Sequence, residues 1–418
     1  MTSTELTKGS LSTIDFVILV AGTPERSMDF ALVLHLKRAP SLEALQRGAR
    51  SARNLYPTTG SHIKNYHWRR FTEPADGVEV AAATGDENSA TAIEAFLKTP
   101  FDPHTQMPVR QLVVRSESGR VRIISRFHHT AADGLSAAMW LAHQLGVARG
   151  EISSTTDANV FHALAINTHP SPVKRSRYAF DRGSDRLWTS GPGSSGHRRW
   201  VTIDIPMSDL RRRCARLGGF SYNDLLATCA LETFSLWNRE HCGSREQRVS
   251  LWLPVNIRSK ACADFGNGSS RVRLYATDAR PASLSEKCRE IRQQISWSMD
   301  HGEWSVPTGT RLSRLPPAAK ATLLRWYLHR PGVDMATGVF SHVDRLPPFE
   351  HDAWDDLEKV ECIGQLHARH SLSINGFTRS GQTWLTFTYD PGLLSFEDVQ
   401  RIQEIYQDQI AQARRELV

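Results

Sequence analysis

The chain has 418 residues, which is long for one ordinary hydrophobic core and suits two. Apolar residues make up 40% and charged residues 23%, so the composition excludes a mostly disordered chain. The net charge of +7, from 51 Lys and Arg against 44 Asp and Glu, is by itself no nucleic-acid-binding signature, and we expect no nucleic-acid partner. The excess of basic residues would suit binding of a phosphate-bearing cofactor or of an acidic protein. It is also compatible with an ordinary solvated surface.

No stretch approaches the roughly 18 consecutive apolar residues that a membrane-spanning helix needs, so we expect no membrane span. The early apolar run from Phe16 to Ala21 follows Asp15 and is about half as long as a signal-peptide core, so it predicts a strand or a core segment. Six cysteines without a C-x-x-C pair indicate reduced thiols, and neither a disulfide framework nor a zinc ribbon. These cysteines are Cys214, Cys229, Cys242, Cys262, Cys288 and Cys362. Together these features predict a cytoplasmic protein.

The first half of the chain alternates strand and helix patterns. Ser41 is the expected cap of a helix that turns Leu42, Leu45 and Ala49 to one face. A hairpin is expected around Glu117-Ser118-Gly119. The other elements expected here are strands over Phe30–Leu36, Arg110–Arg115 and Val121–Phe127, and a helix from about Leu135 to Val147.

A polar stretch separates the two halves. Residues 171–199 are rich in Arg, Gly, Ser and Pro, which cannot build a core, so they predict a linker or crossover between domains 1–170 and 200–418. Within it, Gly191 to Gly196 matches the dinucleotide-binding pattern G-x-G-x-x-G. No strand precedes it and a strand rather than a helix follows, so we interpret it as part of the linker.

The second half repeats the alternation. Its clearest signal is an amphipathic helix over Ser221–Trp237, and Ser395 is expected to start the terminal helix. The other elements expected here are strands over Trp200–Ile205, Ser250–Val255, Val272–Tyr275 and Trp384–Tyr389, and a basic helix from about Ser208. Alternation in both halves predicts an α/β fold with α+β layers.

One segment carries the chemistry. An alternating strand over Ile123–Phe127 runs into His128 and His129, a tight turn with Asp133-Gly134, and an apolar helix. Neighbouring strand side chains point to opposite faces, so one histidine should pack inward while the other faces a cleft. Gly134 is expected where the backbone bends into the helix.

A histidine in such a turn suits general base catalysis, because an ordinary imidazole titrates near pH 6.5 and is mostly neutral at pH 7. No activated Ser or Cys nucleophile is evident beside it, which favours direct attack by an acceptor. The competing interpretations are two buried structural histidines, or a metal site. Divergent side chains and the lack of His-x-x-x-His spacing argue against metal, and we expect none.

The segment from His128 to Gly134 resembles the HHxxxDG signature of the thioester-dependent acyltransferases. That superfamily includes chloramphenicol acetyltransferase, condensation domains of peptide synthetases, plant BAHD acyltransferases, polyketide-associated acyltransferases and wax ester synthases. The resemblance covers most of the chain in order. The other matching segments are Phe96–Asp102, Met107–Arg110, Ser221–Leu226, Leu253–Arg258 and Phe265–Asn267. It implies two chloramphenicol-acetyltransferase-like halves that form a pseudo-dimer around a tunnel.

The resemblance also implies roles for single residues. His129, the second histidine of the motif, would be the catalytic base, while His128 and Gly134 would be structural. Asp133 would pair with an arginine that shapes the site, and Arg258 is the candidate.

The "DFGWG" element of the plant enzymes is absent, which favours a bacterial relative in secondary metabolism. Ser371–Phe377 stands in its place as a latch or tunnel-wall strand. Asn256, Ser373 and Asn375 are candidate substrate or tunnel residues.

The implied reaction moves an acyl group from a thioester of coenzyme A, or of a carrier protein's phosphopantetheine arm, to a hydroxyl or amine. The acceptor would be a small molecule or a tethered substrate. The thioester is a co-substrate, and no tightly bound cofactor is expected. Backbone N–H groups near Gly134 would help to stabilise the oxyanion.

Two other functions stay open on this fold. One is a catalytically silent, condensation-like domain that recruits a carrier protein or a partner enzyme. The other is a catalyst of cyclisation or elimination on a tethered substrate.

Overall fold

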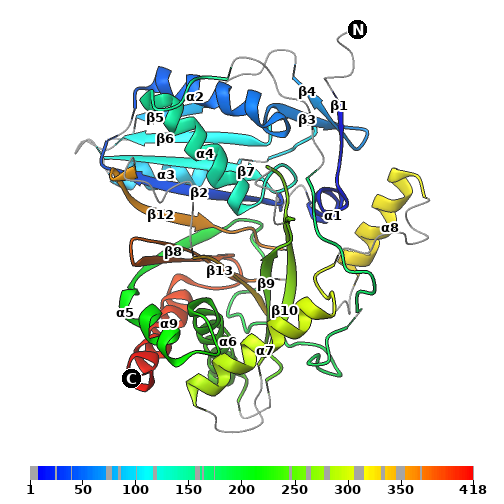
Figure 1. Ribbon diagram of the computed structural model, residues 1–418, viewed down its shortest axis with the longest axis vertical. Coiled ribbons are helices and arrows are strands. Elements are labelled where there is room, and N and C mark those ends of the chain that lie inside the picture. The colour runs from blue at the N-terminus through cyan, green and yellow to red at the C-terminus, as the bar shows by residue number, and fades with distance from the viewer. Residues whose placement is uncertain are drawn as a thin grey trace.

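The chain forms two sheet-rich halves, the N-terminal half above and the C-terminal half below in Figure 1. The structure is a computed structural model that describes the main part of the chain. The described residues are 8–23, 26–38, 40–71, 78–82, 86–99, 101–115, 120–155, 161, 164–173, 175–243, 247–259, 265–276, 283–305, 315–330, 335–344, 354–367 and 370–417.

A five-stranded sheet forms the centre of the N-terminal half. Its strands, in spatial order, are β12 (Leu357–Ile363), β2 (Asp29–Leu36), β7 (Val121–His128), β6 (Val109–Arg115) and β5 (Val78–Ala82). Strands β6 and β7 pair in antiparallel orientation, so the predicted hairpin is confirmed. Its expected turn, Glu117-Ser118-Gly119, lies outside the described residues.

Helices cover both faces of this sheet, because strand side chains alternate in direction. Leu32 and Leu34 pack with α2 (Leu42–Leu55) and α4 (Gly134–Arg149), while Ala31 and Val33 pack with α3 (Asp86–Lys98). Helices α2 and α4 touch closely, since a Cβ placed on Gly48 would lie 2.2 Å from the carbonyl oxygen of Gln144. The predicted helices after Ser41 and from Leu135 are confirmed.

The apolar run from Phe16 to Ala21 is part of a helix, α1 (Thr13–Ala21), so the expected strand was wrong. Ser12 caps this helix: its side chain accepts from the N–H of Asp15, and the Asp15 carboxylate accepts from the N–H of Ser12. This reciprocal pair satisfies two N–H groups that a helix start leaves without partners. A small sheet joins β1 (Lys8–Ser10) to β4 (His67–Arg70) and β3 (Ser61–Lys64), the two strands that come after η2 (Pro57–Gly60) in the chain.

A six-stranded mixed sheet forms the centre of the C-terminal half. Its strands, in spatial order, are β10 (Ser269–Tyr275), β9 (Ser250–Asn256), β11 (Gly338–Val343), β13 (Leu372–Arg379), β14 (Gln382–Tyr389) and β8 (Arg199–Pro206). The helices of this half are α5 (Ser208–Leu217), α6 (Tyr222–Cys242), α7 (Leu284–Asp300), α8 (Pro317–His329) and α9 (Phe396–Glu416). The strands and helices expected in this half are confirmed.

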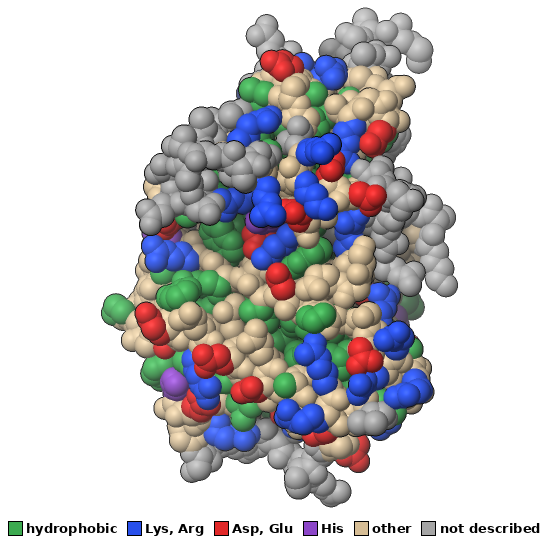
Figure 2. Space-filling view, turned by 90° about the vertical axis from the view of Figure 1, so that its left-hand side faces the viewer, with side chains coloured by type: hydrophobic (Ala, Val, Ile, Leu, Met, Phe, Trp, Pro, Cys, Tyr) green, Lys and Arg blue, Asp and Glu red, His purple; other side chains and the backbone are tan. Residues whose placement is uncertain are grey.

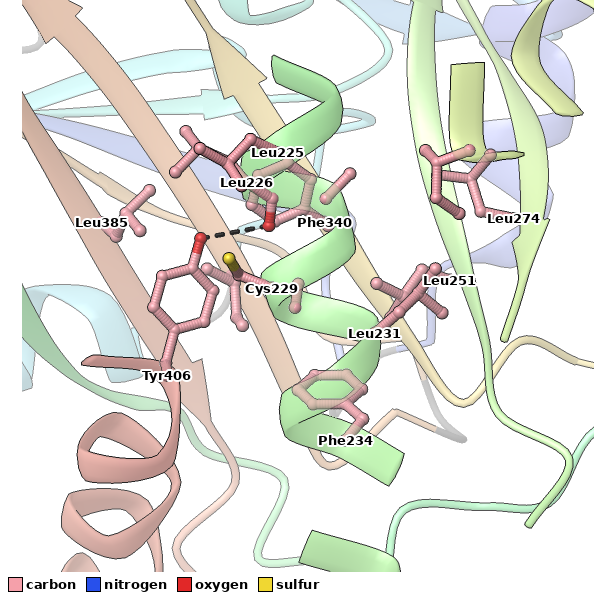
Figure 3. Close-up of a cluster of buried hydrophobic side chains, with 14 of the residues drawn as sticks. Leu225, Leu226, Cys229, Leu231, Phe234, Leu251, Leu274, Phe340, Leu385 and Tyr406 are labelled. Carbon is pink, nitrogen blue, oxygen red and sulfur yellow. Dashed lines mark hydrogen bonds between the residues drawn. The ribbon is translucent and has the colours of Figure 1, made fainter. Parts of the chain in front are cut away.

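One face of this sheet forms the larger hydrophobic core. Figure 3 shows Leu385 and Phe340 of the strands beside Leu225 and Leu226 of α6, with Tyr406 of α9 alongside. The hydroxyl of Tyr406 donates to the carbonyl oxygen of Leu226 at 3.1 Å, so the one polar atom of this large side chain is satisfied.

The opposite face of the sheet joins the two halves, and part of it carries polar side chains. The hydroxyl of Thr386 accepts from the N–H of Cys362 at 3.2 Å, and that of Thr388 accepts from the N–H of Gly364 at 2.9 Å. Cys362 belongs to β12, which pairs with β2 of the N-terminal sheet. Strand β12, at the junction in Figure 1, therefore belongs to the N-terminal sheet although it comes from the C-terminal half of the sequence.

The segment expected to be a latch or a tunnel-wall strand does form a strand. Residues 371–377 lie largely in β13, inside the six-stranded sheet between β11 and β14, so it is not a separate latch, and its place in a tunnel wall stays a prediction. The strand that spans the halves is β12, which the sequence analysis did not predict. Leu372 and Ile374 of β13 belong to the large core, which explains why this apolar strand lies inside the sheet.

Within the described part of residues 171–199, no helix or strand forms before β8 begins at Arg199. The segment is nevertheless held in place: Leu187 joins the larger core, and Gly191 donates its N–H to the carbonyl oxygen of Leu393 at 3.0 Å. No helix follows the glycines at 191–196, so they lack the context of a dinucleotide site. The domain boundaries at 170 and 199 stay predictions.

The described surface mixes charges of both signs. On the face shown in Figure 2, Lys and Arg side chains are interspersed with Asp and Glu. Within the described ranges, no helix combines the length and the apolar composition needed to cross a membrane. Cys214, Cys229, Cys242, Cys288 and Cys362 are free thiols, and Cys262 lies outside the described residues.

Candidate active site

The motif lies where β7 ends and α4 begins. His128, the last residue of β7, is buried, and its Nδ1 lies 2.8 Å from the hydroxyl of Thr130. Burial lowers the pKa of His128 to about 3, so this ring stays neutral near pH 7. A sealed, neutral imidazole suits a structural role.

His129 follows in the turn and is only partly buried. Its backbone N–H donates to the carbonyl oxygen of Met28 at 2.8 Å, which ties the turn to the segment before β2. Its ring meets Phe30 edge-on at 5.3 Å, and its Nδ1 lies 3.1 Å from Oδ1 of Asn267. The two histidines thus have different environments, as the alternation of strand side chains led us to expect.

The orientation of the Asn267 amide follows from its other contacts. Its amide nitrogen donates to Oδ1 of Asp15 at 2.8 Å and also to the carbonyl oxygen of His129. A backbone carbonyl can only accept, so the nitrogen faces it and Oδ1 faces the ring. Oδ1 can only accept as well, so Nδ1 of His129 carries the proton and Nε2 carries the free lone pair.

Asp15 is the outer member of this chain of contacts. It is buried, and burial raises the pKa of its carboxyl group to about 6. The hydrogen bonds from Asn267 and from Ser12 oppose that rise. The helix cap of α1 therefore fixes the carboxylate that in turn fixes the amide of Asn267.

Asp133 and Arg258, which the sequence analysis expected to pair, are joined by two hydrogen bonds of 2.7 and 2.8 Å. Both side chains are buried. Asp133 also caps α4, because its Oδ1 accepts from the N–H of Ser136 at 3.0 Å. An ion pair with this geometry satisfies charges that would be costly to bury alone.

The same pair holds the segment that presents Asn267. Arg258 donates to the carbonyl oxygen of Gly266 at 2.7 Å, and Gly268 donates its N–H to Oδ2 of Asp133 at 3.0 Å. These two glycines flank Asn267. The Asp133–Arg258 pair is therefore placed to fix the position of Asn267 against His129.

The structure places the other candidate residues away from the His129 ring contacts. Oδ1 of Asn256 accepts from the N–H of Arg258 at 3.1 Å, so Asn256 supports the ion pair. Ser373 and Asn375 are buried and hydrogen-bonded to each other at 3.0 Å. Gly364 covers them, since a Cβ placed there would lie 2.2 Å from Nδ2 of Asn375. Their assignment to a tunnel stays a prediction.

Gly134 was expected to be glycine because the backbone bends there into the helix, and this reason was wrong. Among the described glycines, those with left-handed backbone angles do not include Gly134, so its conformation does not require glycine. A Cβ placed on it would meet no atom within 4 Å. Gly134 therefore borders open space at the start of α4.

Two residues of this arrangement were not predicted from the sequence. Asn267 was noted only as part of a segment that matches the acyltransferase superfamily, and Asp15 only as the residue before an apolar run. The spacing Ser12-x-x-Asp15 is a capping-box signal that was available. Asp15 and Asn267 are 252 positions apart, and no local pattern predicts their contact.

Among the described residues, no three His, Cys, Asp or Glu side chains lie together as a metal site would require. The arrangement around His129 instead combines an imidazole, an amide and a carboxyl group. Its chemical capacity is proton transfer at Nε2.

The structure was compared with solved structures. The first condensation domain of the calcium-dependent antibiotic synthetase, in complex with a substrate analogue, superposes with a TM-score of 0.70 at 14% identity, over 98% of both chains. The starter condensation domain of rhizomide synthetase RzmA, in complex with C8-CoA, gives 0.68 at 14% identity over 97% of this chain and 95% of that chain. The TRI3 trichothecene 15-O-acetyltransferase from Fusarium sporotrichioides gives 0.67 at 11% identity, over 99% and 98% of the two chains.

Sequence comparison gives a weaker signal. A putative diacylglycerol O-acyltransferase of Mycobacterium bovis, Mb3115, and a probable one of Mycobacterium tuberculosis, Tgs4, are each 25% identical over 117 residues. The match covers 28% of this chain and 24% of each relative's length. No protein-family model matches the chain. The chain therefore has the chloramphenicol-acetyltransferase-like fold of condensation domains and acetyltransferases, as its sequence led us to expect.

Proposed function

We propose that this protein is an acyltransferase that moves an acyl group from a thioester to a hydroxyl or amine acceptor. His129 is the general base of this reaction. One observation carries the proposal: the partly exposed ring of His129 is held at Nδ1 by Asn267, at the end of β7. The fold shared with condensation domains and an acetyltransferase supports acyl transfer in general.

The chemistry follows from the free lone pair on Nε2. This nitrogen takes the proton of the acceptor hydroxyl or amine as the acceptor attacks the thioester carbonyl. The tetrahedral intermediate then collapses, the carbon–sulfur bond breaks, and the imidazolium returns its proton to the departing thiolate. The ester or amide and the free thiol are the products, and no covalent acyl-enzyme is needed.

Asn267 and Asp15 act as positioning residues in this scheme. The Asn267 oxygen keeps the proton on Nδ1, and the same oxygen stabilises the imidazolium that forms during the reaction. Asp15 keeps the amide of Asn267 in that orientation. Asp133 and Arg258 hold the backbone on both sides of Asn267.

The oxyanion needs donors as well. The N–H of Ser136 at the start of α4 already donates to Asp133. A contact from this helix start would therefore come from the N–H of Gly134 or Leu135, beside the open space at Gly134.

The proposed donor is a thioester of coenzyme A or of a carrier-protein phosphopantetheine arm, and no tightly bound cofactor takes part. The rhizomide synthetase domain named above was solved with C8-CoA, which supports the first choice. Two of the similar structures are domains of synthetases, which supports a carrier-protein partner and a place in bacterial secondary metabolism. We place the reaction in the cytoplasm, and the route of donor and acceptor through a tunnel is part of the proposal.

A single-turnover assay tests this function. The full chain is mixed with a panel of acyl-CoA and acyl-pantetheine thioesters, together with hydroxyl and amine acceptors. The masses of the products are then measured by mass spectrometry. We expect acceptors that gain the mass of the acyl group as free thiol appears.

Two outcomes would refute the proposal. Binding of thioesters without transfer would indicate a recruiting domain. Conversion of a tethered substrate without acyl gain would indicate cyclisation or elimination.

A further inference from the structure

Helix α8 carries an unusual outer surface. Leu323 is 46% exposed, Trp326 63% and Tyr327 47%, and these are three of the six large hydrophobic residues exposed in the described part of the chain. The helix lies beside α1, at the right-hand edge of Figure 1. One short helix thus exposes half of these residues.

The three side chains lie on the outward face of α8. Ala321 is buried and marks the inward face. At about 100° per residue, Leu323, Trp326 and Tyr327 point roughly 140–240° away from Ala321. A surface helix normally turns polar side chains to that side, so α8 is apolar on both its inner and its outer face.

All charged side chains of α8 and of the residue after it are basic, namely Lys320, Arg325 and Arg330. Lys320 and Arg330 lie on the side of Tyr327, whereas Arg325 lies about 40° from Ala321. The guanidinium carbon of Arg330 lies 5.3 Å from the ring centre of Trp326 and 4.9 Å from that of Tyr327. Aromatic rings with basic neighbours are the combination that binds the interface of an anionic membrane.

We propose that α8 docks the protein on the surface of a membrane that contains anionic lipid. Leu323, Trp326 and Tyr327 enter the boundary between headgroups and acyl chains, while Lys320 and Arg330 stay at the phosphate level. The helix lies in the interface and does not cross the bilayer. Since α8 packs on α1, which carries Asp15, the membrane lies one helix away from the candidate active site.

Vesicle flotation tests this proposal. The full chain is incubated with vesicles of phosphatidylcholine alone and of phosphatidylcholine mixed with phosphatidylglycerol. We expect it to float with the anionic vesicles, and to float less as the salt concentration rises.

Matched variants locate the contact. The double variant Leu323→Ser/Trp326→Ser should bind the anionic vesicles at least about tenfold more weakly, because it removes two of the inserting side chains. Lys320→Glu/Arg330→Glu should weaken binding to anionic vesicles and make the remaining binding less dependent on salt. The control is Phe396→Ser, which removes another 46% exposed hydrophobic residue, from α9, and should bind like the wild type.

Three results would overturn the proposal. The wild type does not float with anionic vesicles, or Phe396→Ser loses as much binding as the α8 double variant. The third is a wild type that sediments as a dimer while the double variant is a monomer, since a second copy would then cover α8. The double variant should keep its melting temperature and its turnover of water-soluble thioesters, so this test is independent of the acyl-transfer assay.

Discussion

Nδ1 of His129 lies 3.1 Å from Oδ1 of Asn267, although the two residues are 138 positions apart. The contact joins the turn after β7 to the segment just before β10. It also assigns the proton on the ring, because the amide nitrogen of Asn267 is already committed to Asp15 and to a carbonyl oxygen. The proposed base function of His129 therefore depends on residues from both halves of the chain.

Replacement of His129 should remove most acyl transfer. Loss of a general base typically costs about 10²–10⁴-fold, and His129→Ala should lose turnover in this range while it keeps its melting temperature. The exposed His197 lies on a loop and provides the control, because His197→Ala should react like the wild type. A His129→Ala variant with wild-type turnover would show that another group takes the proton.

Replacement of Asn267 should lower turnover without weakening substrate binding. Asn267→Ala removes the acceptor that orients the imidazole, and a loss of about 10–100-fold in kcat with little change in KM is expected. Steady-state kinetics with a thioester substrate measure both constants.

A second Asn–His pair in the molecule supplies the control for that experiment. Oδ1 of Asn223 lies 3.2 Å from Nδ1 of His342. Asn223→Ala should cost stability but leave kcat unchanged. If both variants lose kcat in proportion to their loss of stability, Asn267 has only a structural role.

Local patterns in the sequence predict most of the helices and strands. The alternation in Phe30–Leu36 and the helical spacing in Ser221–Trp237 are confirmed as β2 and α6. Phe16 to Ala21 shows the limit, because a short apolar run has no period that separates a strand from a buried helix. Only the cap Ser12, read together with Asp15, would have indicated the helix.

Long-range contacts could not be predicted in this way. The place of β12 beside β2 depends on pairing between residues more than 300 positions apart, such as Val360 and Leu34. The contact of Asn267 with Asp15 depends on the same kind of assembly. The motif around His129 was visible because its residues are adjacent, whereas the residues that orient His129 come from distant segments.

The buried pair of Asp133 and Arg258 should be essential for stability. Asp133→Asn leaves the guanidinium group without its charged partner and should lower the free energy of unfolding by about 3–5 kcal/mol. Asp209 forms an exposed pair with Arg213 at 2.9 Å, and Asp209→Asn should cost at most about 1 kcal/mol. Urea titrations measure both free energies of unfolding. Equal losses would show that the buried Asp133–Arg258 pair contributes no more to stability than the exposed Asp209–Arg213 pair.

Substitution by alanine should affect stability differently at two glycines near the site. Gly134→Ala adds a methyl group where no atom lies within 4 Å and improves helix propensity, so stability should stay equal or rise by about 0.5–1 kcal/mol. Gly268→Ala places its Cβ 2.3 Å from Cγ of Arg258 and should destabilise the protein.

Activity measurements on Gly134→Ala show whether substrate occupies the open space beside Gly134. If substrate occupies it, Gly134→Ala should raise KM or lower kcat although the protein is as stable as the wild type. Melting curves and steady-state kinetics of the same preparation decide this. Unchanged kinetics would show that substrate does not use the space.

Stability should fall as the pH drops below neutrality. Burial lowers the pKa of His128, His342 and His370 to about 3, whereas an unfolded histidine titrates near 6.5. The unfolded chain therefore binds protons that the folded chain does not, and each histidine costs about 1.4 kcal/mol per pH unit once the pH is below about 6.5. Asp15 acts in the opposite direction, because burial raises its pKa to about 6 and its folded form gains a proton first.

The balance of these groups gives a measurable slope. Among these four groups, three histidines against one carboxyl group leave about two protons, so together they should lower the free energy of unfolding by roughly 3 kcal/mol per pH unit between about pH 6 and pH 5. His342→Gln keeps partners for Asn223 and Thr378 but removes one titrating group. Its slope should be smaller than that of the wild type by about 1.4 kcal/mol per unit, and the two curves should run parallel above about pH 7. Urea titrations at a series of pH values measure the slopes, and identical slopes at acid pH would show that His342 takes up its proton in the folded state.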